Sequence, residues 1–198
     1  CTLFQECVAG AFALYNKDQL TPVKLPNSSI PSLVTEHNDI GGGRFFDPRS
    51  KQSFKYDHLR KEASDLQAWE SDTAVESWRD ALESQFTEYT ANHYKHGVCA
   101  VFGQSRNDSV SLVACIEDHQ FQPKNYWNGR WRSQWCATLT GGTGELQGTL
   151  RVQVTPSVVL FSPLILHSLL FYIRFIIMKM VMSSLSVLRM LNIHSRVR

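Results

Sequence analysis

Three residues near the middle of the chain have types and spacing that could bind a metal ion. His93, His96 and Cys99 lie three positions apart from one another, and imidazole nitrogens and thiolates are the ligands that zinc prefers in proteins. A structural zinc site needs about four ligands, and no second ligand pair follows these three. His96 and Cys99 also lie where a predicted helix gives way to a predicted strand. We therefore expect no metal site, and we predict that His93 packs against neighbouring side chains or caps the helix.

Two glycine-rich segments could hold a phosphate group, because closely spaced glycines allow backbone N–H groups to approach an anion. They are residues 41–43, GGG, and residues 140–144, TGGTG. Neither segment is followed by the Lys and Ser/Thr of a P-loop, and neither has the glycine spacing of a dinucleotide-binding fold. We predict that both segments are turns.

A third segment, residues 126–135, alternates aromatic and basic side chains in the run YWNGRWRSQW. Such a segment could stack on the bases of a single-stranded nucleic acid and neutralise its phosphates. The alternative is a β-turn at Asn128 and Gly129 that leads into a strand whose tryptophans lie in the core, since Asn-Gly is a strong hairpin signal. The charge balance favours the second reading. Residues 155–198 carry five of the 20 basic residues and none of the 18 acidic ones, so residues 1–154 have a net charge of −3.

No catalytic constellation is present in the sequence. No Gly-x-Ser-x-Gly motif occurs, and no carboxylate pair stands out from the solvated charges of the helices. We expect no enzyme activity and no cofactor. The five cysteines are odd in number and contain no Cys-x-x-Cys pair, which predicts a reducing compartment such as the cytoplasm. The sequence begins with Cys1 rather than Met and shows no secretory signal, so we predict a truncated amino terminus.

The clearest predicted element is an amphipathic helix that ends before Gly97. Thr73 and Glu76 have the spacing of a capping box at its start, and a glycine is well suited to end a helix. Apolar side chains recur every three or four residues, as expected for one buried helix face. They are Val75, Trp78, Leu82, Phe86, Tyr89 and His93.

After Gly97 the hydrophobic period changes from 3.6 to 2, which indicates antiparallel strands with one buried and one wetter face. Residues 98–103 and 110–117 are predicted strands on either side of a polar turn at residues 105–108. Two further strands flank residues 141–144. The side chains that we expect to fill the inner face of this sheet are Trp131, Trp135, Leu139, Leu146, Leu150 and Val152.

The first 70 residues are less regular. Residues 3–14 have nearly helical spacing, Pro22, Pro26 and Pro31 then prevent a long helix, and residues 32–36 could form a short strand. We predict a loop-rich lead-in. With a helix followed by a meander of strands, the chain is predicted to have an α+β fold, and its 198 residues suffice for one domain with an appendage.

Four segments resemble, in the same order, the F-actin-capping protein alpha subunit family. They are residues 15–24 (YNKDQLTPVK), 54–65 (FKYDHLRKEASD), 114–117 (ACIE) and 119–133 (HQFQPKNYWNGRWRS). The likeness runs from about Gly10 to Gln153. It implies that the helix and meander form part of that family's fold, without catalysis or cofactor.

The resemblance also implies partners and a location. It implies a heterodimer with a capping protein beta subunit, whose strands join the same antiparallel sheet. It further implies calcium-independent binding to the barbed ends of actin filaments, which blocks subunit exchange, in the cytoplasm on the actin cytoskeleton. It implies neither a nucleic-acid nor a membrane partner.

Family members continue with further sheet, a long helix and a basic amphipathic segment that contacts actin. The motifs of those elements are missing here, so no actin-binding residue is assigned. We interpret residues 1–154 as a partial alpha subunit domain and residues 155–198 as an off-family hydrophobic tail.

The tail has two interpretations. Residues 154–173 contain no charged side chain, and about 20 such residues can cross a bilayer, which would make the chain a tail-anchored membrane protein. Pro163 disfavours this interpretation. The alternative, which we favour, is a retained intron followed by a frame-shifted exon. Residues 175–184 can be encoded so that a shifted frame reads like the family's continuation, and codons for Val154 and Arg174 can supply the intron ends.

Overall fold

The computed structural model describes five stretches of the chain. They are residues 2–70, 72–106, 109–121, 127–140 and 143–156, and for residues 2–7, 127, 143 and 154–156 only the backbone is described. The chain divides into two compact units, Cys1–Phe121 with Gly129–Val154, and Gln122–Asn128 with Thr155–Arg198. Apart from two strand ends, the described helices and strands belong to the first unit.

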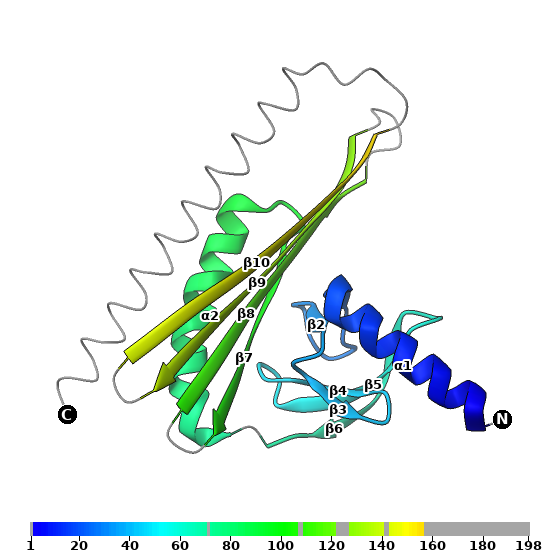
Figure 1. Ribbon diagram of the computed structural model, residues 1–198, viewed down its shortest axis with the longest axis horizontal. Coiled ribbons are helices and arrows are strands. Elements are labelled where there is room, and N and C mark those ends of the chain that lie inside the picture. The colour runs from blue at the N-terminus through cyan, green and yellow to red at the C-terminus, as the bar shows by residue number, and fades with distance from the viewer. Residues whose placement is uncertain (1, 71, 107–108, 122–126, 141–142, 157–198) are drawn as a thin grey trace. The chain divides into compact units, whose positions relative to one another are not determined.

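The described stretches contain helices and antiparallel strands, as Figure 1 shows. In chain order they are α1 (Thr2–Gln19), β1 (Thr21–Val23), β2 (Ser32–Val34), β3 (Asp39–Gly41), β4 (Arg44–Asp47), β5 (Gln52–Asp57), β6 (Glu62–Ala68), α2 (Thr73–His93), β7 (Val98–Arg106), β8 (Ser109–Gln120), β9 (Trp127–Thr140) and β10 (Thr143–Pro156). The strands form three sheets, with orders β1-β2, β3-β4-β5-β6 and β10-β9-β8-β7. The fold is α+β, as predicted.

The segment between α1 and α2 contains six short strands, so the expectation of a loop-rich lead-in is wrong there. Residues 41–43 do form the predicted turn, between β3 and β4, and their φ angles of 89°, 64° and 73° lie in a region that favours glycine. The short strand predicted at residues 32–36 is present as β2. The other five strands were not predicted, because strands of three to seven residues show little periodicity. Together the six strands enclose a small core of their own. Its members are Val23, Leu25, Val34, Phe45, Phe54 and Tyr56.

The predicted amphipathic helix is present as α2, with differences at both ends. The N-cap is Asp72 rather than Thr73. Its Oδ1 accepts a hydrogen bond of 3.0 Å from the backbone N–H two residues later. The helix ends at His93, and Gly97 lies in the turn that leads to β7. A Cβ at Gly97 would lie 2.6 Å from Tyr94 Cβ, so this turn needs a residue without a side chain.

The four-stranded sheet β10-β9-β8-β7 is the meander that the alternation predicts. Its strands are longer than predicted, with Val98 paired to Glu117 in β7–β8 and Ser109 paired to Thr140 in β8–β9. β8 remains paired with β9 as far as Gly129. The β-turn predicted at Asn128 and Gly129 is therefore wrong, because both residues already lie in β9.

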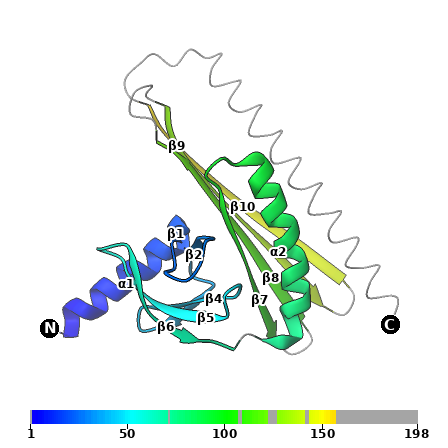
Figure 2. The ribbon, with the colours of Figure 1, turned by 180° about the vertical axis from the view of Figure 1, so that it is seen from behind.

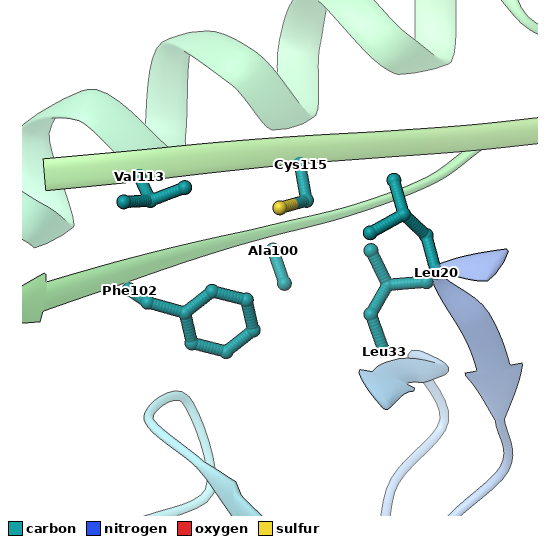
Figure 3. Packing of buried hydrophobic residues seen from close by; sticks show 6 residues of the cluster. All are labelled: Leu20, Leu33, Ala100, Phe102, Val113 and Cys115. Carbon is teal, nitrogen blue, oxygen red and sulfur yellow. The ribbon is translucent and has the colours of Figure 1, made fainter. Parts of the chain in front are cut away.

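β7 and β8 are buried on both faces, whereas the alternation predicts one wetter face. α2 covers one face of the sheet, as the two ribbon views show (Figures 1 and 2). The other face packs against residues that follow α1, which Figure 3 shows in detail. The buried members of this second cluster are Leu20, Leu33, Ala100, Phe102, Val113 and Cys115.

The predicted helix stripe is partly confirmed. Val75, Leu82 and Phe86 are buried, whereas Trp78 and Tyr89 are half-buried and His93 is exposed. The remaining buried positions of α2 are polar. They are Arg79, Glu83 and Thr90.

The predicted inner face of the sheet is confirmed most clearly at Trp135, which is 8% exposed. Val152 is 40% exposed, so its predicted burial is wrong. The reason is that β10 is an edge strand and has a neighbouring strand on one side only. The other predicted members are half-buried. They are Trp131, Leu139, Leu146 and Leu150.

Candidate functional site

The segment that alternates aromatic and basic residues forms part of β9 and places a charged cluster on the sheet. The β8–β9 register pairs Glu117 with Arg132 and His119 with Arg130. Glu117 is only 1% exposed. Its Oε1 accepts a hydrogen bond of 2.7 Å from Arg130 Nε and lies 3.3 Å from His119 Nδ1. The Arg130 guanidinium therefore compensates for the burial of this carboxylate.

The same arginines hold the end of α1. Arg130 Nη1 donates to Gln19 Oε1 at 2.8 Å and its Nη2 donates to the Gln19 carbonyl at 2.7 Å. Arg132 Nη1 donates to the Asp18 carbonyl at 2.8 Å. The last carbonyls of a helix have no partner within the helix and carry partial negative charge, so guanidinium groups bind well there. We call Asp18, Gln19, Glu117, Arg130 and Arg132 the α1 joint.

The geometry of the α1 joint decides between the two readings of the aromatic and basic segment. Arg132 is 8% exposed, and burial, followed by the charges of Arg130 and Arg151, lowers its pKa. The Trp131 ring lies 6.0 Å from the Tyr94 ring, and Trp135 is in the core. Because both arginines donate to backbone carbonyls and Trp135 is buried, these side chains support the interpretation of the segment as a strand that packs in the fold.

A second charged cluster joins α2 to the turn after β4. Arg79 and Glu83 are 5% and 6% exposed and form a direct ion pair, in which Arg79 Nη1 donates to Glu83 Oε2. Arg49 Nε lies 3.3 Å from Glu83 Oε1 and 3.8 Å from Asp47 Oδ1. The Asp47 carboxylate also accepts a hydrogen bond of 2.8 Å from Ser32 Oγ. The cluster thus connects a helix, a turn and a strand that are distant in sequence.

Burial raises the pKa of Glu83, while Arg49 and Arg79 oppose that shift. The sequence analysis did not predict this cluster, because it considered only the apolar side chains of the helix. The signal was available, since Arg79 and Glu83 are four positions apart and lie on the face of Val75 and Leu82.

The residues considered as metal ligands have other contacts. His93 Nδ1 lies 2.8 Å from the Tyr89 carbonyl, and its ring stacks on the Tyr89 ring at 4.2 Å. The buried Cys99 Sγ lies 3.5 Å from Thr87 Oγ1. His96 is exposed. Among the side chains that the structure describes, no three His, Cys, Asp or Glu groups converge as metal ligands.

An open groove of about 650 Å³ lies between α1 and the β3-β4-β5-β6 sheet, and sequence reasoning did not find it. His58 is central to it. Its ring stacks on Phe12 at 4.1 Å, and its Nε2 lies 2.9 Å from Asn16 Oδ1. Burial lowers the pKa of His58. Through these contacts with Phe12 and Asn16 of α1, His58 attaches α1 to the β3-β4-β5-β6 sheet.

The fold of the described residues places this chain in a structural class. Their α+β arrangement is similar to the solved structure of the homodimeric actin capping protein alpha subunit from Plasmodium berghei. The TM-score is 0.60 at 13% sequence identity, over 80% of this chain and 71% of that one. At this identity the likeness concerns the fold.

The sequence relationship gives the family. Residues 2–155 match the family model of the F-actin capping protein alpha subunit, and the chain belongs to that family. The F-actin-capping protein subunit alpha of Caenorhabditis elegans is 46% identical over 157 residues, which are 77% of this chain and 54% of that protein. Subunit alpha-3 of Homo sapiens is 35% identical over 145 residues, 73% of this chain and 48% of that protein. The chain therefore spans about half the length of these relatives.

No helix among the described residues is both long and apolar enough to cross a membrane. The apolar run at residues 154–173, on which the membrane interpretation depends, lies outside the described residues from residue 157 onward.

Proposed function

We propose that this chain acts as the alpha subunit of a heterodimeric F-actin-capping protein. In this role it pairs with a beta subunit in the cytoplasm, and the pair binds the barbed ends of actin filaments and blocks subunit exchange. The observation that carries the proposal is the family match over residues 2–155, which covers nearly all of the described structure. The role is one of binding rather than catalysis.

The α1 joint supports the proposal. Its residues all fall within three of the four segments that carry the family resemblance, namely 15–24, 114–117 and 119–133. The contacts of Arg130 and Arg132 with the end of α1 show what those segments do in the fold. They attach the first helix to the central sheet.

We propose that residues 1–154 form a partial alpha subunit domain, and that residues 155–198 derive from a retained intron followed by a frame-shifted exon. On this proposal the tail has no membrane role, and its apolar character reflects non-coding sequence.

The test is co-expression of the full chain with a capping protein beta subunit. We expect the two to co-purify in a 1:1 complex, and the complex to slow elongation of actin filaments from seeds with free barbed ends. The matched control is the beta subunit expressed alone. Failure of the two chains to co-purify would refute the heterodimer. A stable complex that leaves barbed-end growth unchanged would refute capping by this chain while leaving the pairing intact.

A further inference from the structure

Two histidines from different elements lie side by side at one end of the central sheet. His96 is in the turn between α2 and β7, and His119 is near the end of β8. The β7–β8 register pairs Val98 with Glu117, and two residues further along both segments it places His96 opposite His119. Their ring centroids are 6.2 Å apart, and the ring planes are inclined by 23°. The fold therefore brings together two imidazoles that no short sequence motif connects.

The His119 ring is oriented by a buried carboxylate. Its Nδ1 lies 3.3 Å from both carboxylate oxygens of Glu117, which is 1% exposed. A carboxylate accepts hydrogen bonds and does not donate them, so Nδ1 carries the ring hydrogen and Nε2 keeps its lone pair. A carboxylate on one ring nitrogen is typical of histidines that bind a metal through the other, because it fixes the tautomer and makes the ligand nitrogen more basic.

The His96 backbone is held in place while its ring is accessible. The backbone N–H of His96 donates to Asp118 Oδ1 at 3.1 Å, and the N–H of Gly97 donates to the Tyr94 carbonyl at 3.2 Å in the same turn. The His96 residue is exposed, and the His119 side chain is 35% exposed. An ion can therefore reach both rings from solvent.

The separation of the rings suits a shared ion. With a metal–nitrogen bond of about 2.0–2.1 Å, an imidazole centroid lies about 3 Å from the ion, so two rings on one ion have centroids about 4.5–6.5 Å apart. The observed 6.2 Å falls within this range. A small rotation of the exposed His96 ring is enough to adjust the geometry.

The nearby charges and the ligand type define the kind of ion. Arg130 Nε donates to Glu117 Oε1 at 2.7 Å, so these two charges largely offset each other, and Asp118 adds a negative charge beside His96. Imidazole nitrogens favour Zn²⁺, Cu²⁺ and Ni²⁺, whereas Mg²⁺ and Ca²⁺ favour oxygen ligands. Among the described side chains no three potential ligands converge. Water would therefore complete the coordination of an ion bound by the two rings.

We propose that His96 and His119 form a two-histidine surface site for a divalent transition-metal ion, with Zn²⁺ as the ion and Nε2 of His119 as one ligand. Of the residues that the sequence suggested as ligands, only His96 takes part, and His93 and Cys99 do not. A bound ion would connect the turn after α2 to the end of β8 and would stabilise the folded chain by mass action. The proposal rests on contacts within this chain and is independent of its role toward actin.

The experiment is a Zn²⁺ titration of the full chain, purified without a polyhistidine tag. Calorimetry measures the affinity, and NMR of the histidine ring nitrogens identifies the ligands. We expect a shift of the Nε2 signal of His119. His96→Gln and His119→Gln should each weaken binding about tenfold or more, because a second ligand held on the same frame acts at a high effective concentration. His93→Gln, which removes another exposed imidazole, is the matched control and should leave the affinity unchanged.

Thermal unfolding provides a second readout. Zn²⁺ should raise the unfolding temperature of the full chain, and this increase should disappear in His96→Gln, whose exposed position makes loss of the fold an unsuitable explanation. Ca²⁺ at the same concentration should have no such effect.

Four outcomes would overturn the proposal. They are no binding of Zn²⁺, binding that neither His96→Gln nor His119→Gln weakens, an equal loss of affinity in His93→Gln, and a stabilisation by Zn²⁺ that persists in His96→Gln. The second outcome would assign the ion to other ligands, such as the cysteine thiols. The third would assign it to the His93, His96 and Cys99 motif.

Discussion

At the scale of single residues, the side chains with the largest structural roles are charged ones in the interior. Glu117 is 1% exposed and depends on Arg130, whose guanidinium also binds the end of α1. A buried carboxylate without a partner is strongly unfavourable, whereas an intact pair contributes little net stability. The importance of such residues is therefore visible when one partner is removed.

We predict that Arg130→Ala lowers the free energy of unfolding by about 3–5 kcal/mol, because it leaves the Glu117 carboxylate buried and unpaired. Denaturant titration measures this loss. Arg60→Ala is the control, since the Arg60 side chain is 79% exposed in its ion pair with Asp57 and should change stability by less than about 1 kcal/mol. The double variant R130A/E117Q should recover part of the loss. Equal losses of unfolding free energy in Arg60→Ala and Arg130→Ala would contradict this prediction.

His37 makes stability depend on pH. Burial lowers its pKa, against the opposing effect of the Glu36 carboxylate, and the amide nitrogen of Gln134 lies 2.7 Å from its Nε2. The unfolded chain then binds a proton at a higher pH than the folded chain. Stability is therefore full above a pH of about 6.5 and is lost as the pH falls through the lowered value.

We predict that the free energy of unfolding decreases as the pH falls from about 7 to 5, and that His37→Gln reduces this decrease. The pKa of His58 is also lowered, so some pH dependence remains in the variant. Unfolding curves at several pH values measure the effect. His93→Gln, at an exposed position, serves for comparison. A pH profile that His37→Gln leaves unaltered would refute the assignment.

At the scale of secondary-structure elements, α2 shows how a pattern can be right while its boundary is wrong. The spacing of Thr73 and Glu76 predicted a capping box, but Asp72 provides the cap. Glu76 instead places its carboxylate 2.7 Å from Lys51 Nζ. The second oxygen of Asp72 also accepts a hydrogen bond of 3.2 Å from the Ser105 backbone N–H. Asp72 therefore serves both the helix and the end of β7.

We predict that Asp72→Ala lowers the free energy of unfolding by about 1 kcal/mol, because the helix loses the acceptor for an unpaired N–H group. Thr73→Ala should have a much smaller effect, since Thr73 is the first helical residue and is exposed. Thermal or denaturant unfolding of the two variants compares them directly. Equal losses, or a larger loss at Thr73, would favour the capping box that the sequence suggested.

At the scale of the whole molecule, the chain has a part that matches the family and a carboxy-terminal segment that does not. Residues 2–155 match the family model, and the chain spans about half of the Caenorhabditis elegans relative. The compact unit that contains the central sheet ends at Val154.

The proposed origin of residues 155–198 predicts a particular transcript. Sequencing across the codons for Gln153 to Phe175 should find a major spliced form in which the Gln153 codon continues directly in the family's frame. The inserted length would be 20 codons and two bases, which changes the frame. A transcript population with only the unspliced form, together with accumulation of the encoded protein, would refute the proposal and make the tail a true part of the protein.

The sequence by itself determined the α+β class, the presence of the amphipathic helix and the alternation of the long strands. Each of these depends on residue types at fixed spacing along one element, and such periodicity is a local property of the chain. The four resembling segments add specificity, because long runs rich in Trp and charged residues rarely recur by chance.

Only the tertiary structure decided which elements meet. The contacts of Arg130 and Arg132 with the end of α1 join residues that are distant in sequence. So does the ion pair of Arg49, in the turn after β4, with Glu83 of α2. The burial of both faces of β7 likewise depends on elements that are distant in sequence. A pattern along one strand shows which side chains share a face, but burial depends on what covers that face. For this reason Val152 was expected in the core, whereas its place on an edge strand leaves it exposed.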